Sequence, residues 1–336
     1  MVRAYESTIE LEIERLESVP LTPEIGSAEC YPFPLLEPSG TRSRLEFRTL
    51  VLENPYVRVA VAPDLGGRIV EFLDKRSNTA VLPELGSIVA GGPRGATLNG
   101  GIQIGLFDAE GQGERRNALG PVEAVLVPAD DDDEPAFIDL YELATGTGLA
   151  WRLRVGLAPD QALIHLEFRL HNRTFAQVPL DAGLLFPSDV LGNASAGVVA
   201  SFPPGSLVPV GGVLRRGTAG IAPFQTDVWE TTLLPISRFG AASAASEVGV
   251  LGIADGKLEL QLAQSLPGGK VVLVRPGDET LEASVPATPN EVLRTEVGEV
   301  DKIVVLDAYK NVRLSWQNGT SADRPRSSRG AATASS

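Results

Sequence analysis

The chain has little cysteine, little histidine and no long apolar run. Cys30 is the only cysteine among 336 residues, which excludes an intramolecular disulfide and a thiolate metal cluster. No stretch approaches the ~20 apolar residues that a membrane-spanning helix needs. Residues 1–17 are charged throughout and lack the apolar core of a signal peptide. These absences predict a soluble, cytoplasmic protein that uses neither a metal nor another cofactor.

Positive charge is in deficit. The chain has 29 lysine and arginine residues against 43 aspartate and glutamate residues, and its net charge is −14. Partners that present phosphates, such as nucleic acids and anionic membranes, need basic residues to neutralise them. The charge balance therefore predicts no nucleic-acid partner and no membrane partner, whereas it does not exclude a small neutral ligand such as a sugar.

Almost every segment of the chain has the pattern of a β-strand. Val57, Val59 and Val61 alternate with their neighbours, which is the period-two pattern of a half-buried strand. Similar short segments recur along the chain, and none has the 3.6-residue period of a long amphipathic helix. The pattern predicts an all-β protein with a single domain over residues 7–318 and a disordered tail over residues 319–336.

Two glycine-rich segments are the most informative feature of the sequence. Residues 52–78 read as a strand, a tight turn at Gly66-Gly67 and a second strand that begins at Arg68, and residues 100–103 read Gly-Gly-Ile-Gln. Glycine permits the sharp reversals and close backbone approaches that such segments need. Together with Asn-Arg-Thr at 172–174, their order and spacing resemble the galactose-mutarotase-like superfamily. The most similar branch is a bacterial domain of unknown function often found ahead of tetratricopeptide repeats.

This resemblance implies a fold, a ligand class and a reaction. The fold is a β-supersandwich, in which two large antiparallel sheets pack face to face and a groove on the concave side holds a carbohydrate. The reaction is that of an aldose 1-epimerase, in which a base takes the anomeric proton and an acid protonates the ring oxygen. A glutamate and histidines do this in the family, since their pKa values suit proton transfer near neutral pH.

The positions of these catalytic residues are altered in this chain. A gap-free reading from Gly100 places Gln103 where the family has glutamate and Glu110 where it has histidine. An alternative reading compares residues 112–114 with a His-Gly-Glu loop and places Gln112 at the histidine. Glutamine hydrogen-bonds a hydroxyl but does not transfer a proton at neutral pH. We therefore expect no efficient epimerase activity, with Glu110 and Glu114 as weak candidates for a replacement acid.

The two histidines of the chain do not supply the missing imidazole. His165 and His171 lie on one expected strand and share its polar face. They are six residues apart, which corresponds to about 20 Å at ~3.3 Å per residue, so they cannot both touch one sugar ring. We interpret both as polar-face residues of a strand.

Four residues are the candidates for sugar binding. Arg68 and Gln103 would supply directed hydrogen bonds, and Gln112 would add a second amide. An ion pair of Arg68 with Asp64 or Glu71 is an equally good interpretation of that arginine. Trp229, in a segment that reads as irregular, is the best candidate for an apolar platform under the sugar ring.

Three functions remain open. The first is a carbohydrate-binding protein without efficient epimerase activity, and the second is a protein-interaction or scaffold module with a filled groove. The third is an active epimerase that uses carboxylates in place of histidine. An open polar cleft around Arg68, Gln103 and Glu110 favours a sugar, whereas a groove plugged by residues 192–220 favours the scaffold.

Overall fold

The structure is all-β, as the sequence predicts. The computed structural model describes residues 1–19, 35–92, 95–107, 118–144, 148–187, 190–191, 196–201, 208–210, 212–216, 220–237, 242–277 and 279–318. Strands account for the regular structure of these residues, apart from one 3₁₀ turn, η1 (Pro63–Leu65). A helix long and apolar enough to cross a membrane is not found among them.

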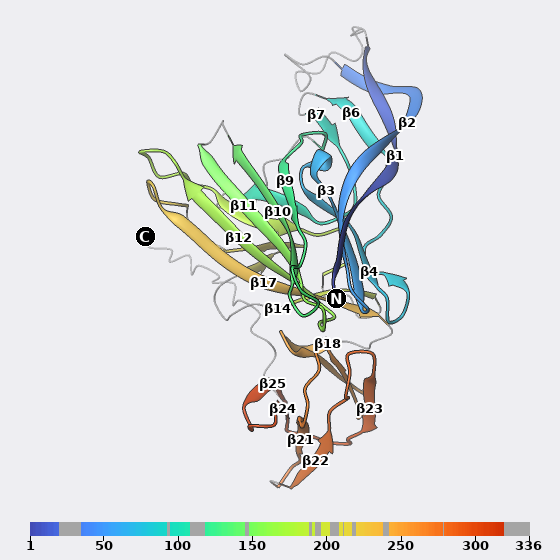
Figure 1. The fold of residues 1–336 in the computed structure, drawn as a ribbon, viewed down its shortest axis with the longest axis vertical. Coiled ribbons are helices and arrows are strands. Elements are labelled where there is room, and N and C mark those ends of the chain that lie inside the picture. The colour runs from blue at the N-terminus through green and yellow to red at the C-terminus, as the bar shows by residue number, and fades with distance from the viewer. Residues whose placement is uncertain are drawn as a thin grey trace, which may run out of the picture.

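A seven-stranded sheet forms from the first part of the chain. Its strand order is β5-β4-β3-β2-β1-β6-β7, and its pairs are antiparallel except that β1 and β6 run parallel. The long β1–β2 hairpin projects beyond the rest of the sheet (Figure 1). The strands are β1 (Arg3–Val19), β2 (Leu35–Glu53), β3 (Val57–Ala62), β4 (Arg68–Asp74), β5 (Thr79–Ala80), β6 (Ile88–Gly92) and β7 (Gly95–Thr97).

A six-stranded and a four-stranded antiparallel sheet follow. The first has the order β14-β17-β12-β11-β10-β9 and the second the order β15-β16-β13-β8. Their strands are β8 (Gln103–Phe107), β9 (Glu123–Val127), β10 (Ala136–Ala144), β11 (Leu149–Leu157), β12 (Ile164–Asn172), β13 (Asp181–Leu185), β14 (Ala196–Ser201), β15 (Val208–Val210), β16 (Val213–Arg215) and β17 (Thr226–Ser237).

These three sheets bury one common core. Val59 of the seven-stranded sheet, Phe168 of the six-stranded sheet and Leu184 of the four-stranded sheet belong to the same apolar cluster. On β12, alternate residues from Ile164 to Leu170 are buried in it, because successive side chains of a strand point to opposite faces. Face-to-face packing of antiparallel sheets therefore holds this part of the molecule together.

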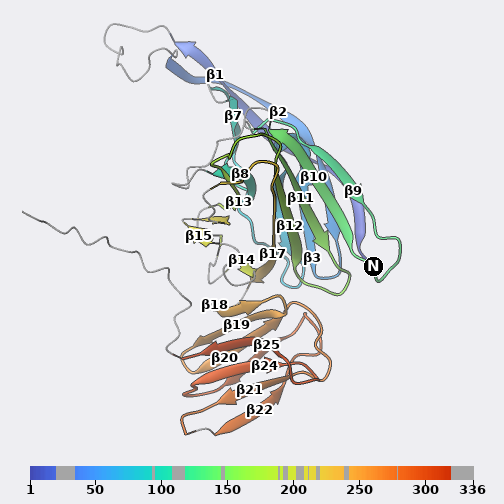
Figure 2. The same cartoon turned by 90° about the vertical axis from the view of Figure 1, so that its left-hand side faces the viewer.

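The C-terminal strands form a second sandwich with a core of its own. Two four-stranded sheets, in the orders β18-β19-β20-β23 and β22-β21-β24-β25, enclose a separate apolar cluster that includes Leu260, Leu273 and Ile303. Figures 1 and 2 show these strands grouped below the other sheets. The strands are β18 (Ala242–Ser246), β19 (Gly249–Ala254), β20 (Lys257–Leu262), β21 (Lys270–Val274), β22 (Thr280–Ser284), β23 (Val292–Glu296), β24 (Lys302–Leu306) and β25 (Val312–Gln317).

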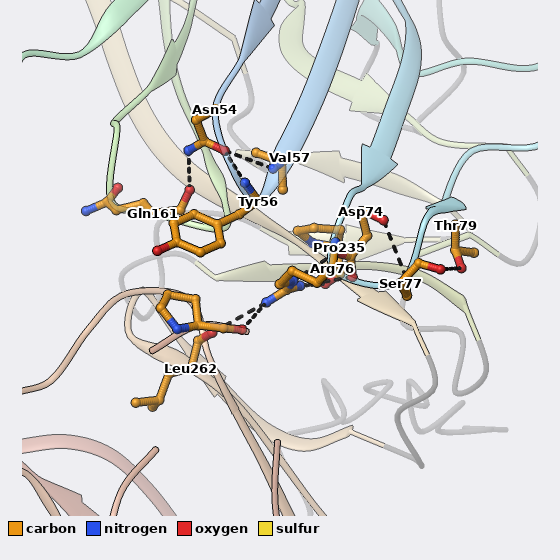
Figure 3. A network of polar contacts seen from close by, with 11 residues as sticks. Asn54, Tyr56, Val57, Asp74, Arg76, Ser77, Thr79, Gln161, Pro235 and Leu262 are labelled. Atoms are coloured by element: carbon orange, nitrogen blue, oxygen red, sulfur yellow. Dashed lines mark hydrogen bonds and ion pairs between the residues drawn. The ribbon is translucent and has the colours of Figure 1, made fainter. Parts of the chain in front are cut away.

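A buried ion pair connects the two cores (Figure 3). Arg76, in the turn after β4, donates from Nε to Asp74 at 2.8 Å, and both side chains are buried. Its other nitrogens donate to the carbonyl oxygens of Pro235 at 2.9 Å, Pro289 at 3.3 Å and Leu262 at 3.5 Å. Arg76 of the N-terminal sheets is thereby hydrogen-bonded to the backbone of the C-terminal sandwich at Leu262 and Pro289. That residues 7–318 unfold cooperatively as one domain stays a prediction.

Asn54, in one of the segments that resemble the mutarotase-like family, is a structural residue. Its amide Nδ2 donates to the carbonyl oxygens of Ala158 and Gln161, each at 2.7 Å. Its Oδ1 accepts hydrogen bonds from the backbone nitrogens of Tyr56 and Val57 at 2.9 and 2.8 Å. Asn54 thus fixes the β2–β3 turn to the loop before β12 (Figure 3).

Asn172 does the same at the other end of the six-stranded sheet. It is fully buried, and its Nδ2 donates to the carbonyl oxygens of Ala176, Ile221 and Ala222 at 2.8 to 3.1 Å. Its Oδ1 accepts from the backbone nitrogen of Thr174 at 2.9 Å and from its hydroxyl at 2.8 Å. The Asn-Arg-Thr segment therefore serves the fold by satisfying backbone groups that would otherwise be buried unpaired.

Candidate functional site

The β3–β4 turn places Arg68 at the start of a strand. Gly66 and Gly67 both have positive φ angles, 75° and 71°, a region that side chains with a Cβ avoid. A Cβ at Gly67 would also lie 3.1 Å from Val122 Cγ2 and 3.3 Å from Leu140 Cδ1. Only glycine allows the turn to lie this close to the six-stranded sheet, as the sequence predicts.

The two glycine-rich segments lie side by side. Ile69 and Ile102 form an isolated antiparallel bridge, with N–H to O=C bonds of 3.0 and 2.9 Å in the two directions. A Cβ at Gly101 would stand 2.7 Å from the Ile69 carbonyl oxygen and 2.9 Å from Arg68 Cδ. The absence of a side chain at Gly101 therefore makes room for the Arg68 side chain against the backbone.

Arg68 is buried and forms no ion pair with a carboxylate among the residues that the structure describes. It is 4% exposed and donates to the carbonyl oxygen of Gly100 and, from a terminal nitrogen at 3.0 Å, to Gln103 Oε1. Its Nε has no hydrogen-bond partner in the described part of the chain. Burial lowers the pKa of its guanidinium to about 10, so the group is still cationic at neutral pH.

The ion pair considered for Arg68, with Asp64 or Glu71, is formed with neither of these described residues, and Glu71 pairs with Arg58 instead. Arg68 and Glu71 occupy the same strand three residues apart, and the β3–β4 register shifts between them, so that Glu71 pairs with Ala60 and Arg68 with Ala62. Arg68 and Gln103, by contrast, meet as the sequence led us to expect. Their contact brings together two residues 35 positions apart in the chain.

An aromatic ring lies on the same face of β8 as Gln103. Gly105 and Gly183 lie opposite each other on β8 and β13, and a Cβ at either would stand 2.8 or 3.1 Å from the Phe107 ring. Phe107 therefore lies across both glycines and is itself buried. Leu185, paired with Gln103, is 39% exposed next to this ring. Phe107 was not among the residues predicted from the sequence, although Gly105, two residues earlier on the same strand face, indicates room for a ring.

Trp229 does not form an exposed platform, so that interpretation is wrong. Its segment is the regular strand β17, and the side chain is 4% exposed. Its ring stacks on Phe168 with centroids 5.1 Å apart, and Phe168 stacks in turn on Trp151 at 6.0 Å. Pairing with β12 turns Trp229 toward the core and leaves Glu230 on the opposite face.

The remaining candidates cannot be placed. Glu110, Gln112 and Glu114 lie outside the described residues, as do residues 192–195, 202–207, 211 and 217–219 of the segment 192–220 that was considered as a plug. The described residues hold no group of three or more histidine, cysteine or acidic side chains that could bind a metal ion.

The two histidines occupy the same face of β12, as predicted. His165 Nε2 lies 2.6 Å from Gln161 Oε1, and His171 Nδ1 lies 2.9 Å from the Thr226 hydroxyl. Their strand face is opposite to the one that packs against β8 and β13, because the buried residues of β12 alternate with them. Neither histidine reaches Arg68 or Gln103.

A family model matches part of the chain. Residues 26–177 match the model of a family described as a domain of unknown function, DUF5107. The match includes both glycine-rich segments and Asn172, which are the features of the resemblance noted in the sequence. No curated protein matches the chain.

Several solved structures resemble the chain at low sequence identity. A TPR-domain-containing protein from Parabacteroides distasonis is 15% identical with a TM-score of 0.43, and the match covers 94% of this chain and 54% of that protein. A galactose mutarotase-like protein from Clostridium acetobutylicum is 10% identical with a TM-score of 0.31, covering 81% of this chain and 96% of that one. A putative aldose 1-epimerase from Escherichia coli is 14% identical with a TM-score of 0.27, covering 79% and 95%. This chain spans about half the length of the Parabacteroides protein.

Proposed function

We propose that the protein is a cytoplasmic carbohydrate-binding protein without efficient epimerase activity, and that the sugar binds beside Arg68 and Gln103. The observation that supports this best is the buried guanidinium of Arg68. A buried charge normally has a carboxylate partner, whereas among the described residues Arg68 bonds only neutral oxygen atoms and its Nε has no hydrogen-bond partner. A ligand hydroxyl oxygen next to Arg68 would supply the missing acceptor.

The contact with Arg68 also orients Gln103 for a ligand. Because Oε1 of Gln103 accepts the hydrogen bond from Arg68, its amide Nε2 is the end that remains to donate to a ligand. Gln103 is half-buried at the first position of β8, so the amide is held by a strand rather than by a loop. A rigid donor of this kind suits a sugar hydroxyl, since little conformational entropy is lost on binding.

The same residues argue against proton transfer. A glutamine amide does not ionise, and an arginine with a pKa of about 10 holds its proton at neutral pH. A pair of groups that exchange protons near pH 7 is what ring opening requires. Glu110 or Glu114 would have to supply that chemistry in an active epimerase.

A protein-interaction module is the second candidate. The Phe107 ring lies over Gly105 and Gly183 on the same strand face as Gln103, which reduces the room for a ring-shaped ligand beside Gln103. In addition, Phe175 and Phe224 form an edge-to-face pair with centroids 4.9 Å apart, and they are 91% and 53% exposed. Exposed aromatic side chains of this kind are enriched where proteins bind one another.

Calorimetric titration with mono- and oligosaccharides separates these candidates. We expect binding by the wild-type protein and a loss of about 1–2 kcal/mol in Gln103→Ala, the usual range for one or two hydrogen bonds. Gln317→Ala, an exposed glutamine at the end of β25, is the matched control and should bind normally. If the wild-type protein binds no sugar of the panel, or if Gln103→Ala and Gln317→Ala bind sugar with equal affinity, the interaction module is favoured.

A further inference from the structure

A cleft lies on the face of the six-stranded sheet that points away from the common core. It has a volume of about 530 Å³ and opens where β11, β12 and β17 meet the β18–β19 turn and β25. This volume falls within the ~300–1,000 Å³ range of small-molecule sites, which also form preferentially between domains. His165, Thr232 and Glu230 line it from the sheet, and Glu247 and Arg313 line it from the C-terminal sandwich.

The cleft is separate from the Arg68 site. Phe168 and Trp229 point into the core that they share with β8 and β13. Their neighbours Glu167 and Glu230 line the cleft, because adjacent residues of a strand point to opposite faces. The body of the six-stranded sheet therefore stands between the two sites.

The floor of the cleft contains two carboxylates directly opposite each other. Glu167 of β12 pairs with Glu230 of β17 in the strand register, an arrangement that destabilises a sheet when both groups are charged. Glu167 accepts a hydrogen bond from Arg169 at 2.7 Å. Glu230 forms no ion pair or side-chain hydrogen bond with the described residues, so its oxygen atoms remain available as acceptors.

A hydrogen-bond chain fixes the imidazole of His165. Gln161 donates from Nε2 to Gln264 Oε1 at 3.0 Å, so its own Oε1 is the acceptor for His165 Nε2–H at 2.6 Å. Burial lowers the pKa of His165 and outweighs the attraction of Glu247 and Glu230, which favours the neutral ring. In that tautomer Nδ1 has a free lone pair and accepts a hydrogen bond.

Hydroxyl groups and a rigid aromatic wall complete the lining. Thr232 and Ser246 present hydroxyls from the two sandwiches. Thr232 donates to the carbonyl oxygen of Ser201 at 3.3 Å and can still accept, whereas Ser246 accepts from the backbone nitrogen of Val248 at 3.2 Å and can still donate. The Phe137 ring lies against Gly156, where a Cβ would stand 3.0 Å from it, and the guanidinium of Arg154 lies 4.7 Å from its centroid. The ring is thus held in place and gives the cleft a partly apolar side.

The charges around the cleft balance. Arg154 is held by Asp139 and Arg313 by Glu247, at 2.8 and 3.1 Å. Over the cleft and the adjoining strand face there are four acidic and four basic side chains: Asp139, Glu167, Glu230, Glu247, Arg152, Arg154, Arg169 and Arg313. The lining itself holds three acidic and two basic side chains, and all of them except Glu230 form ion pairs. Such a lining, with many donors and acceptors, fits a neutral ligand rich in hydroxyl groups better than an ion.

We propose that this cleft is a second binding site, for a neutral polyhydroxylated small molecule such as a mono- or disaccharide. Glu230 and His165 Nδ1 would accept hydrogen bonds from the hydroxyl groups of this ligand. The site is independent of the one beside Gln103 and goes beyond the proposed function. The ligand would contact both sandwiches, since Ser246 and Glu247 belong to the second.

The test measures binding of D-glucose, D-galactose and maltose to the full chain by saturation-transfer NMR and calorimetry. Glu230→Leu removes the free acceptor and should weaken binding at this site by about tenfold, whereas Thr232→Trp fills the cleft and should abolish it. Glu282→Leu, in the exposed pair with Lys270 on β22, is the matched control and should leave binding unchanged. Near-ultraviolet circular dichroism establishes that each variant is folded.

Each outcome distinguishes this site from the one beside Gln103. Binding that is lost in Glu230→Leu and Thr232→Trp but kept in Gln103→Ala supports the cleft, even if the proposed function fails. Binding that is lost only in Gln103→Ala, or no binding of any of the three sugars, overturns the cleft proposal. Preference for D-glucosamine over D-glucose that fades with added salt would overturn the neutral class of ligand.

Discussion

Arg76 Nε donates to Asp74 Oδ1 across 2.8 Å, and the same guanidinium reaches three carbonyl oxygens from distant parts of the chain. The pair is buried between the two sandwiches (Figure 3). Every charged and polar group in it is matched, which is the condition under which a buried charge is tolerated. This single side chain is therefore a main connection between the N-terminal and C-terminal cores.

Arg76→Ala should destabilise the protein strongly. Removing one member of a buried ion pair leaves the other uncompensated, and the usual cost is about 3–5 kcal/mol. Arg48→Ala removes an exposed pair with Glu6 and should cost less than about 1 kcal/mol. Urea denaturation gives both free energies of unfolding. Equal costs for the two variants would show that the buried pair has no special role.

The same substitution should also change how the protein unfolds. We expect one cooperative transition for the wild type and two for Arg76→Ala, because the two apolar cores are otherwise separate. Trp151 and Trp229 report on the first core and Trp316 on the second, so Trp316→Phe assigns each fluorescence change. Two transitions in the wild type would contradict the prediction of a single domain over residues 7–318.

Gln103→Glu should stabilise the fold at neutral pH. The new carboxylate would face the uncompensated Arg68 and replace a neutral acceptor with a charged one, for a gain of about 1 kcal/mol. Because Arg68 favours the ionised form, the carboxyl pKa is lower in the folded state than in the unfolded state. The gain is therefore present above the unfolded value of about 4.3 and is lost as the pH falls below it.

Thermal denaturation of Gln103→Glu and the wild type between pH 3 and pH 8 tests whether the stabilisation is present at neutral pH and lost in acid. Gln103→Leu is the control, since it removes the acceptor and should lower the melting temperature at every pH. A stabilisation by Gln103→Glu that persists in acid would show that the charge of the new group is not the cause.

Asp139→Asn should destabilise the protein at neutral pH and lose that effect in acid. Burial acts to raise the pKa of Asp139, but hydrogen bonds from Arg154 and Arg152 outweigh it, so the pKa lies below its ordinary value. A carboxylate of this kind adds stability above the unfolded pKa of about 3.9, and the stability disappears as the pH falls through the folded pKa. Denaturation curves of the two proteins should converge in strong acid. Asp160→Asn, at an exposed position, should follow the wild type at every pH.

Mutarotation of galactose and glucose should proceed at the uncatalysed rate in the presence of the protein. The reason is that Gln103 does not ionise and that no histidine lies beside Arg68 in the described structure. Polarimetry measures the rate directly. A large acceleration that disappears in Glu110→Gln or Glu114→Gln would show that a carboxylate has replaced the imidazole.

The strand content and the tight backbone at the two glycine-rich segments were predictable from the local sequence. Alternation along residues 56–61 indicates a strand with Val57, Val59 and Val61 on one buried face, although the structure also buries Ala60 and Ala62 on the other. Glycine at Gly67 and Gly101 indicates close backbone approach. These are local properties, so the sequence expresses them directly. The proximity of Arg68 and Gln103 followed from the resemblance to a known family and not from the local pattern.

The orientation of Trp229 and the role of Arg76 were not predictable. Which face of β17 is buried depends on its register with β12, and a shift by one residue would exchange Trp229 and Glu230. Arg76 lies in a charged turn that resembles a solvated loop in sequence. Its partners include the backbone carbonyl groups at positions 235, 262 and 289. Because every residue has a backbone carbonyl, the sequence does not indicate which of them accept a hydrogen bond from Arg76.

Hydrogen–deuterium exchange with and without a saturating sugar tests the proposed binding site most directly. The sugar used is whichever member of the titration panel binds most tightly. We predict slower exchange of backbone amides in residues 66–69 and 100–106, where Arg68 and Gln103 meet, with residues 270–274 of β21 unchanged. Saturation of the protein by the sugar without protection of either glycine-rich segment would contradict a binding site beside Arg68.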